Sequence, residues 1–124
     1  MTYSATYLRT HRLLSKSKYG NIPTEYKDRL YASKLEADYA WSLDQRKKAK
    51  EIKSWEAQIK LPLKIGEHLI CNYIIDFIVY FPDGTIQYVE TKGLETDIWR
   101  MKWRLLEALI ENRPEVSMGS IRRF

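Results

Sequence analysis

Residues 69 to 92, LICNYIIDFIVYFPDGTIQYVETK, decide the fold of this chain of 124 residues. Residues 69 to 81 are rich in β-branched and aromatic side chains and contain neither glycine nor proline, which is typical of a β-strand. Residues 85 to 92 have the same character and predict a second strand. Residues 82 to 84, PDG, suit a type I turn closed by a left-handed glycine, so the stretch predicts a β-hairpin with a short loop.

The length of this loop sets the register of the hairpin. With a three-residue loop, Asp76 lies directly opposite Glu90, and opposed side chains share a face of the sheet with Cβ atoms roughly 5 Å apart. Lys92 lies two residues beyond Glu90 and therefore on the same face. A two-residue loop would place Asp76 opposite Thr91 instead, so the predicted site depends on the turn.

Two carboxylates beside a lysine are typical of a divalent-metal site that cuts phosphodiesters. Mg²⁺ prefers oxygen ligands, lowers the pKa of its bound water and stabilises charge on phosphorus, while Lys92 can orient or deprotonate that water. The alternative is a surface ion pair, but Asp76 lies inside an apolar run, where an unpaired carboxylate is costly. No glycine-rich phosphate loop is present, so a nucleotide cofactor is not expected.

A fourth candidate lies upstream, on a predicted helix. Residues 33 to 50, SKLEADYAWSLDQRKKAK, have apolar residues near helical spacing. Glu36 lies at the edge of this apolar stripe and would point toward the sheet. Ser33 and Glu36 also match a capping box, in which Glu36 would only accept a hydrogen bond from the Ser33 amide. Both roles stay open.

The other elements predict the α/β fold class, with a central mixed β-sheet flanked by helices. Alternating apolar residues predict a strand over 57 to 63, with Pro62 at a sheet edge or strand end. On this strand, Gln58 is expected to face solvent, with a place near the site as the alternative. Residues 97 to 112 predict a helix capped by Thr96, and residues 116 to 124 a last short strand.

The helix over 97 to 112 has a row of apolar residues along one face, with Trp99, Leu106 and Ile110 alongside. The row consists of Ile98, Met101, Leu105 and Leu109. Composition fits one globular domain over residues 21 to 124, after a basic and flexible N-terminal arm over residues 1 to 20. The single cysteine, and no signal peptide or membrane span, lead us to expect a cytoplasmic protein.

The net charge is +5, and the positive residues gather in clusters separated along the chain. This pattern is typical of a protein that holds a polyanion, although any one cluster could simply be a soluble surface. The acid-free N-terminal arm would order on DNA. The expected nucleic-acid-binding residues are Arg9, Arg12, Lys16, Lys18, Arg46, Lys47, Lys48, Arg100 and Lys102.

The order of these residues resembles the PD-(D/E)XK nuclease superfamily: an acid on the first helix, an aspartate on a strand, then Glu-X-Lys on the next strand. More narrowly, SKLEADYA, IKSWEAQIKLPL, YIIDFIVYFPDG and VETKG resemble a family of small phage-encoded proteins placed in that superfamily. The arrangement is also similar to that of phage endonuclease I-type Holliday junction resolvases. The resemblance covers roughly residues 18 to 112, and Ile75 stands where the family name has proline.

The resemblance implies a restriction-endonuclease-like fold and a role for each site residue. Asp76, Glu90 and the Thr91 carbonyl would bind the catalytic Mg²⁺, for which Mn²⁺ would substitute. Lys92 would act on the attacking water, and Glu36 would bind a second metal or a metal-bound water. The catalytic set implied is thus two strand acids, one lysine and the helix acid.

We therefore expect a metal-dependent DNA endonuclease that acts on branched DNA in phage recombination or replication, in the cytoplasm of the infected host cell. Symmetric cutting requires a homodimer, and Trp99 and Trp103 are candidates for its contact. Two alternatives remain: a non-catalytic nucleic-acid-binding protein on a nuclease-like scaffold, or a nuclease subunit of a larger recombination complex.

Overall fold

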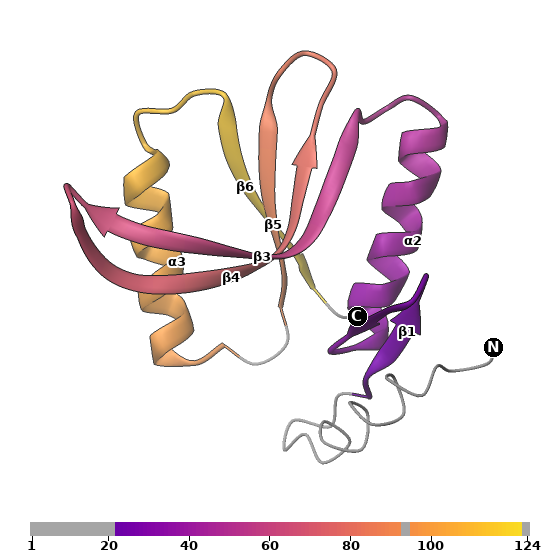
Figure 1. Cartoon of the computed structure of the whole chain (residues 1–124), viewed down its shortest axis with the longest axis horizontal. Helices are drawn as coiled ribbons and strands as arrows, with labels where there is room; N and C mark the ends of the chain where they lie inside the picture. The colour runs from indigo at the N-terminus through magenta and orange to yellow at the C-terminus, as the bar shows by residue number, and fades with distance from the viewer. Residues whose placement is uncertain (1–21, 93–94, 123–124) are drawn as a thin grey trace. The chain divides into compact units, whose positions relative to one another are not determined.

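The structure is a computed structural model that describes residues 22 to 92 and 95 to 122, with the backbone alone at residues 92 and 122 (Figure 1). The expected N-terminal arm lies outside these residues. The elements are β1 (Thr24–Tyr26), β2 (Arg29–Tyr31), α2 (Lys34–Lys48), β3 (Ser54–Ile65), β4 (His68–Tyr80), β5 (Ile86–Lys92), α3 (Asp97–Ile110) and β6 (Val116–Arg122). The chain divides into two compact units, residues 1 to 45 and 46 to 124, which are described separately.

The first unit holds a short antiparallel hairpin, β1–β2, and most of helix α2. Lys27 and Asp28 form the hairpin loop, and both have positive φ, as a type I′ turn requires. Asp44 of α2 joins the helix to the hairpin, because its Oδ2 pairs with Lys27 Nζ at 2.9 Å and accepts a hydrogen bond from the Tyr26 hydroxyl.

Helix α2 is shorter than expected and ends in a Schellman motif. The Glu51 amide donates to the Arg46 carbonyl and the Lys50 amide donates to the Lys47 carbonyl, each at 3.0 Å. Lys50 takes the left-handed conformation, with φ of 63°, that glycine usually supplies in this motif. The missing glycine explains why the helix end was not visible in the sequence.

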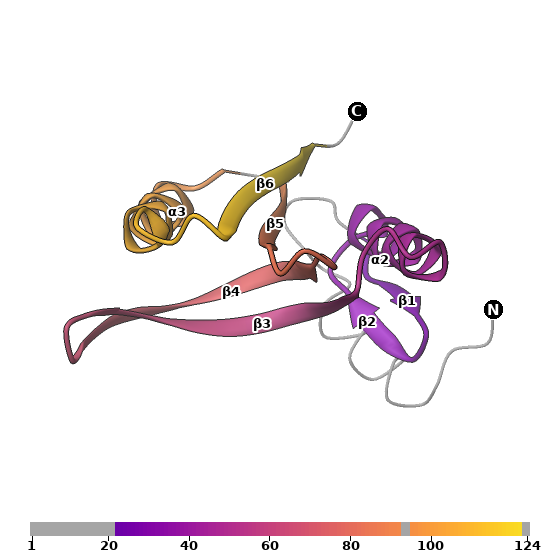
Figure 2. The ribbon, with the colours of Figure 1, turned by 90° about the horizontal axis from the view of Figure 1, so that it is seen from above.

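The second unit holds a mixed four-stranded sheet in the order β3-β4-β5-β6. The pairs β3–β4 and β4–β5 are antiparallel and β5–β6 is parallel, with α3 forming the crossover. Figure 2 shows α3 on one side of the long β3–β4 hairpin. The expected α/β class with a mixed sheet is confirmed, and so is the edge position of Pro62, since β3 is the outermost strand.

The predicted register of the β4–β5 hairpin is confirmed. Phe77 pairs with Val89 and Tyr80 with Ile86. The loop has three residues, because the Phe81 amide donates to the Thr85 carbonyl at 2.9 Å. Asp83 stiffens this loop, since its Oδ1 accepts hydrogen bonds from the amide and the hydroxyl of Thr85 at 2.9 and 2.7 Å.

Only part of the apolar row of α3 packs, since Leu105 is partly buried against the core. Ile98 and Met101 are each 64% exposed, whereas Leu106 is buried and Trp99 and Trp103 are partly buried against the core. The two indole rings stack, with centroids 5.4 Å apart. Apolar residues occupy more than half of the helix circumference, so spacing alone did not select the buried side; the large tryptophan rings bury more apolar area there.

Gly84 tests whether the three-residue loop between β4 and β5 requires a left-handed residue. Gly84 has φ of +90°, and an added Cβ would meet no atom within 4 Å, so Gly84→Ala introduces strain without a clash. We expect it to lower the free energy of unfolding by about 1 to 2 kcal/mol, as measured by urea denaturation. Gly66→Ala, which has φ of +60° and equal space in the β3–β4 loop, should cost a similar amount. An unchanged stability for Gly84→Ala would show that the left-handed turn is not required.

Candidate active site

Asp76 and Glu90 come together at the point where the pairing of β4 and β5 ends. The last recorded pair is Phe77 with Val89, and one further step of that register places Asp76 opposite Glu90. Beyond this pair, β4 contacts β5 through the Asp76 side chain. Its Oδ2 accepts hydrogen bonds from the Thr91 amide at 2.9 Å and from the Thr91 hydroxyl at 2.7 Å. The predicted proximity of the two carboxylates is confirmed.

Glu90 is buried, with 9% of its surface exposed. Burial raises the pKa of its carboxyl from 4.5 to about 8, and the charge of Asp76 adds to this rise. Hydrogen bonds from the Tyr73 hydroxyl, the Asp76 amide and the Trp99 indole act in the opposite direction on the pKa. Within the described residues Glu90 Oε2 has no hydrogen-bond partner. The site therefore holds two neighbouring acids, of which Glu90 is buried.

Tyr73 and Trp99 form the apolar wall over Glu90. The Trp99 indole N–H donates to the Tyr73 hydroxyl at 3.1 Å, and burial raises the pKa of Tyr73 above its usual value. Thr96 caps α3 as predicted, because its Oγ accepts from the Trp99 amide at 3.1 Å. Tyr73 was not expected at the site from the sequence. Trp99 is partly buried within the second unit, and its part in a dimer contact stays a prediction.

The structure leaves the roles of Thr91 and Lys92 as predictions. Both residues lie in β5 and pair with β6, Thr91 with Ile121 and Lys92 with Arg122. The Lys92 side chain lies outside the described part of the chain. Gln58, on the other neighbouring strand, is exposed as expected, yet its backbone lies level with Asp76.

Glu36 has the capping role that the sequence left open. Its amide donates to Ser33 Oγ at 3.2 Å, and its Oε2 accepts from the Ala32 amide at 2.9 Å, one residue earlier than expected. Glu36 belongs to the first unit, and its role as a ligand stays a prediction. Among the described residues, no three His, Cys, Asp or Glu side chains gather as a metal-binding group.

Several of the basic residues expected to bind nucleic acid have partners within the protein. Arg46 pairs with Glu51 at 3.5 Å and lies 5.9 Å from the centroid of the Phe81 ring. Lys102 Nζ donates to the Asn72 carbonyl at 3.0 Å.

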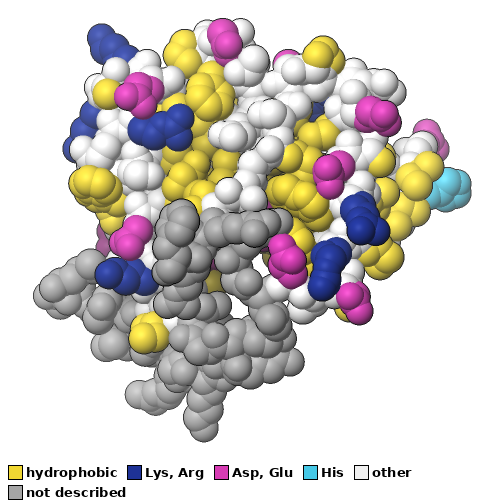
Figure 3. Space-filling model, turned by 180° about the vertical axis from the view of Figure 1, so that it is seen from behind, with side chains coloured by type: hydrophobic (Ala, Val, Ile, Leu, Met, Phe, Trp, Pro, Cys, Tyr) yellow, Lys and Arg dark blue, Asp and Glu magenta, His cyan; other side chains and the backbone are white. Residues whose placement is uncertain are grey.

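The remaining basic residues that the structure describes include one in an ion pair and two that are exposed. Arg100 pairs with Asp97 at 3.4 Å, whereas Lys47 and Lys48 are exposed. On the face in Figure 3, basic side chains alternate with acidic ones. Arg9, Arg12, Lys16 and Lys18 lie outside the described residues.

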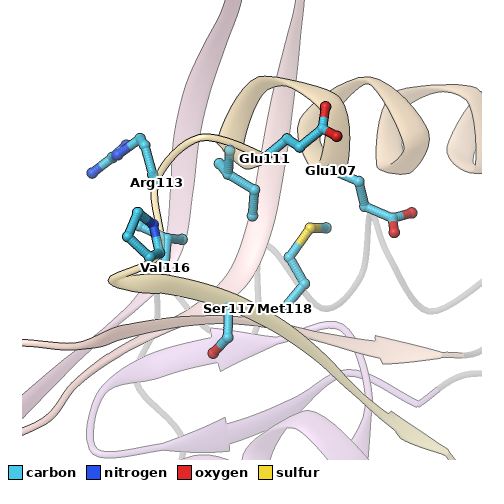
Figure 4. A pocket seen from close by; sticks show the side chains of 8 residues that line it. Glu107, Glu111, Arg113, Val116, Ser117 and Met118 are labelled. Atoms are coloured by element: carbon cyan, nitrogen blue, oxygen red, sulfur yellow. The ribbon is translucent and has the colours of Figure 1, made fainter.

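Two hollows lie along α3. One, of about 360 Å³, lies at the carboxyl end of the helix between α3 and β6 (Figure 4). It includes neither Asp76 nor Glu90. The other, of about 330 Å³, lies between β4 and the amino end of α3 and adjoins the site through Tyr73 and Trp99. We name this second hollow the α3 groove; its lining residues are Lys60, Asn72, Tyr73, Ile74, Thr96, Ile98, Trp99 and Lys102.

Comparison with known proteins identifies a family. A family model described as "Protein of unknown function (DUF1064)" matches residues 16 to 118. The chain belongs to this family. The DUF1064 match contains the helix acid, both strand acids and the lysine of the predicted site. No curated protein and no solved structure matches the chain. No helix in the described part of this DUF1064 chain is long and apolar enough to cross a membrane.

The raised pKa of Glu90 predicts a pH-dependent stability in the absence of divalent ions. Between pH 4.5 and 8 the folded chain keeps a proton on Glu90 that the unfolded chain has lost. The free energy of unfolding should therefore fall as the pH rises through this range, by up to about 1.4 kcal/mol per pH unit, and level off above it. Glu90→Gln should remove this slope in urea denaturation with EDTA.

Glu67→Gln provides the control, since Glu67 is an exposed residue of the β3–β4 loop. It should leave the pH dependence unchanged. Equal slopes for wild type and Glu90→Gln would mean that Glu90 titrates alike in the folded and unfolded chains.

Proposed function

We propose that this chain is a Mg²⁺-dependent endonuclease that hydrolyses DNA phosphodiester bonds, on a restriction-endonuclease-like fold of the PD-(D/E)XK type. The main support is the state of Glu90, whose carboxyl is buried beside Asp76 with one oxygen that no hydrogen bond among the described residues satisfies. Two neighbouring carboxylates, one with an oxygen available for a ligand, suit a hard divalent cation. Mn²⁺ also binds oxygen ligands, so we expect it to substitute.

In this proposal Asp76, Glu90 and the Thr91 carbonyl hold the ion. When bound, the ion would lower the pKa of an attached water and stabilise charge on phosphorus. Thr91 fixes the Asp76 carboxylate through two hydrogen bonds, so the carboxylate is oriented by the fold itself. Tyr73 and Trp99 keep water from Glu90, which strengthens its attraction for a cation.

The two other predicted residues complete the proposed chemistry. Lys92 ends β5 two residues after Glu90, and we assign it to orienting or deprotonating the attacking water. We assign Glu36 to a second ion or to an ion-bound water.

The α3 groove supports a nucleic-acid strand beside the carboxylates. It shares Tyr73 and Trp99 with the site and contains Lys60 and Lys102. Ammonium groups contact phosphates, and aromatic rings stack on bases. A chain of 14.8 kDa has little surface for reading a long base sequence, so we propose a branched substrate, such as a four-way junction in recombination or replication.

We propose a homodimer as the form that acts on such a junction, because two symmetric cuts require two sites related by a two-fold axis. The exposed apolar residues of α3 support this proposal, and Trp99 and Trp103 remain candidates for the contact. These exposed residues are Ile98, Met101 and Leu109.

Cleavage of labelled four-way junction, flap and linear duplex DNA in Mg²⁺ and in Mn²⁺ tests the function. We expect the wild type to cut the junction and Asp76→Asn to cut at least about 100-fold more slowly, since even indirect partners of metal ligands are worth roughly 10- to 100-fold. DNA binding should persist in the variant. Asp83→Asn, in the loop of the same hairpin, should retain the wild-type rate.

The outcomes separate the alternatives. Equal cutting of linear duplex would keep the nuclease and remove its selectivity for branches. Binding by wild type and Asp76→Asn alike, with no cutting by either in both metals, would contradict the nuclease and favour a binding protein.

The exposed lysines at the end of α2 should contact phosphates. Lys47→Ala with Lys48→Ala should weaken DNA binding and reduce the slope of log affinity against log salt by up to about 2, because each phosphate contact contributes about 0.9. Titration by fluorescence anisotropy at several salt concentrations measures this slope. Arg113→Ala, which removes a residue paired with Glu115 at 3.0 Å, serves as the control and should leave the slope unchanged. A double variant with the wild-type slope would place these lysines outside the interface.

A further inference from the structure

Gln58 lies beside Asp76 on the strand opposite to Glu90. In the β3–β4 register, Ala57 pairs with Phe77 and Ile59 with Ile75, so Gln58 falls at the level of Asp76. Asp76 therefore stands between Glu90 on β5 and Gln58 on β3, in the middle of three neighbouring strands.

The backbone of Gln58 is strained. Its φ is +54°, in the left-handed region that favours glycine. The other described non-glycine residues with positive φ are Lys27 and Asp28 in a hairpin loop and Lys50 after a helix. Gln58 is thus the one such residue in a strand of the described chain, and strained residues of this kind concentrate at functional sites.

Gln58 lies at the level where the β3–β4 hairpin changes which residues of β4 face the core cluster. Ile75 and Ile78 both belong to the core cluster under α3, although residues three apart on a regular strand point to opposite faces. The alternation therefore shifts between them, at the level of Gln58. The shift lets a charged residue, Asp76, interrupt an apolar strand without entering the core.

The side chain of Gln58 is accessible at this position. Glycine would adopt the same φ without strain, and the Gln58 side chain is exposed and adds nothing to the core cluster. The side chain is the part of the residue that glycine lacks. Its amide offers N–H donors to an anion, and it lies at the level of the proposed phosphodiester site.

We propose that Gln58 is a substrate-contacting residue whose side-chain amide donates a hydrogen bond to a phosphate oxygen of the DNA strand held beside Asp76. The proposal rests on the proposed function for the position of the strand, although binding tests it separately from cleavage.

Gln58→Gly and Gln58→Glu test the contact, with junction affinity measured in Ca²⁺ and cleavage in Mg²⁺. Gln58→Gly relieves the strain and should raise the Tm, yet weaken binding by about tenfold or more, as expected for a lost hydrogen bond to a charged group. Gln58→Glu keeps the size and the strain but replaces the donor by an acceptor, so it should weaken binding at least as much. Cleavage by both variants should be slower than that of the wild type.

Asp28→Gly is the matched control, because it relieves a similar left-handed residue, with φ of 63°, in the β1–β2 loop and removes no basic side chain. It should raise the Tm and leave affinity and rate unchanged.

Wild-type affinity in Gln58→Gly would overturn the proposal and leave Gln58 as a strand irregularity. A wild type that binds the junction but never cuts it would refute the nuclease, while the affinity of the Gln58 variants would still decide this contact. A wild type that does not bind DNA would refute both.

Discussion

The pairing of β4 with β5 is the constraint on which the rest of the site depends. Side chains alternate along a strand, so a register shift of one residue would carry Glu90 to the opposite face and separate it from Asp76. The three-residue loop prevents this shift, because Gly84 takes a left-handed conformation and Asp83 holds Thr85 through two hydrogen bonds. A local turn thus determines the position of two charges at the other end of the hairpin.

The proximity of Asp76 and Glu90 lowers the stability of the fold, because like charges repel. The burial of Glu90 lowers it further. Trp99 packs with Tyr73 over Glu90 and removes it from water, while the hydrogen bonds to Asp76 come from the adjacent Thr91. A fold selected only for stability would place an apolar residue at position 90. The arrangement is understandable if the stability lost here is recovered when a cation binds, because burial then strengthens the attraction.

The features predicted correctly from the sequence are those that depend on residues close together in the chain. The loop at Gly84, the helix cap at Thr96 and the edge proline of β3 are examples. The packed side of α3 was not predictable from spacing, because apolar residues surround most of the helix and the choice depends on how Trp99 fits against β4. The left-handed Gln58 carries no sequence signal, since the shift in alternation that accompanies it involves two strands.

The capping role of Glu36 does not compete with its proposed role as a ligand. A carboxylate has two oxygens with about four acceptor positions, and the cap bond involves Oε2 and the Ala32 amide. Glu36 also lies in the first turn of α2, at the positive end of the helix dipole, where a negative side chain stabilises the helix. The hydrogen bond from the Ala32 amide restrains the Glu36 side chain, while the Ser33 hydroxyl accepts from the Glu36 backbone amide. The capping box therefore orients a negative group in advance, as the ligands of a metal site are oriented by partners outside the coordination sphere.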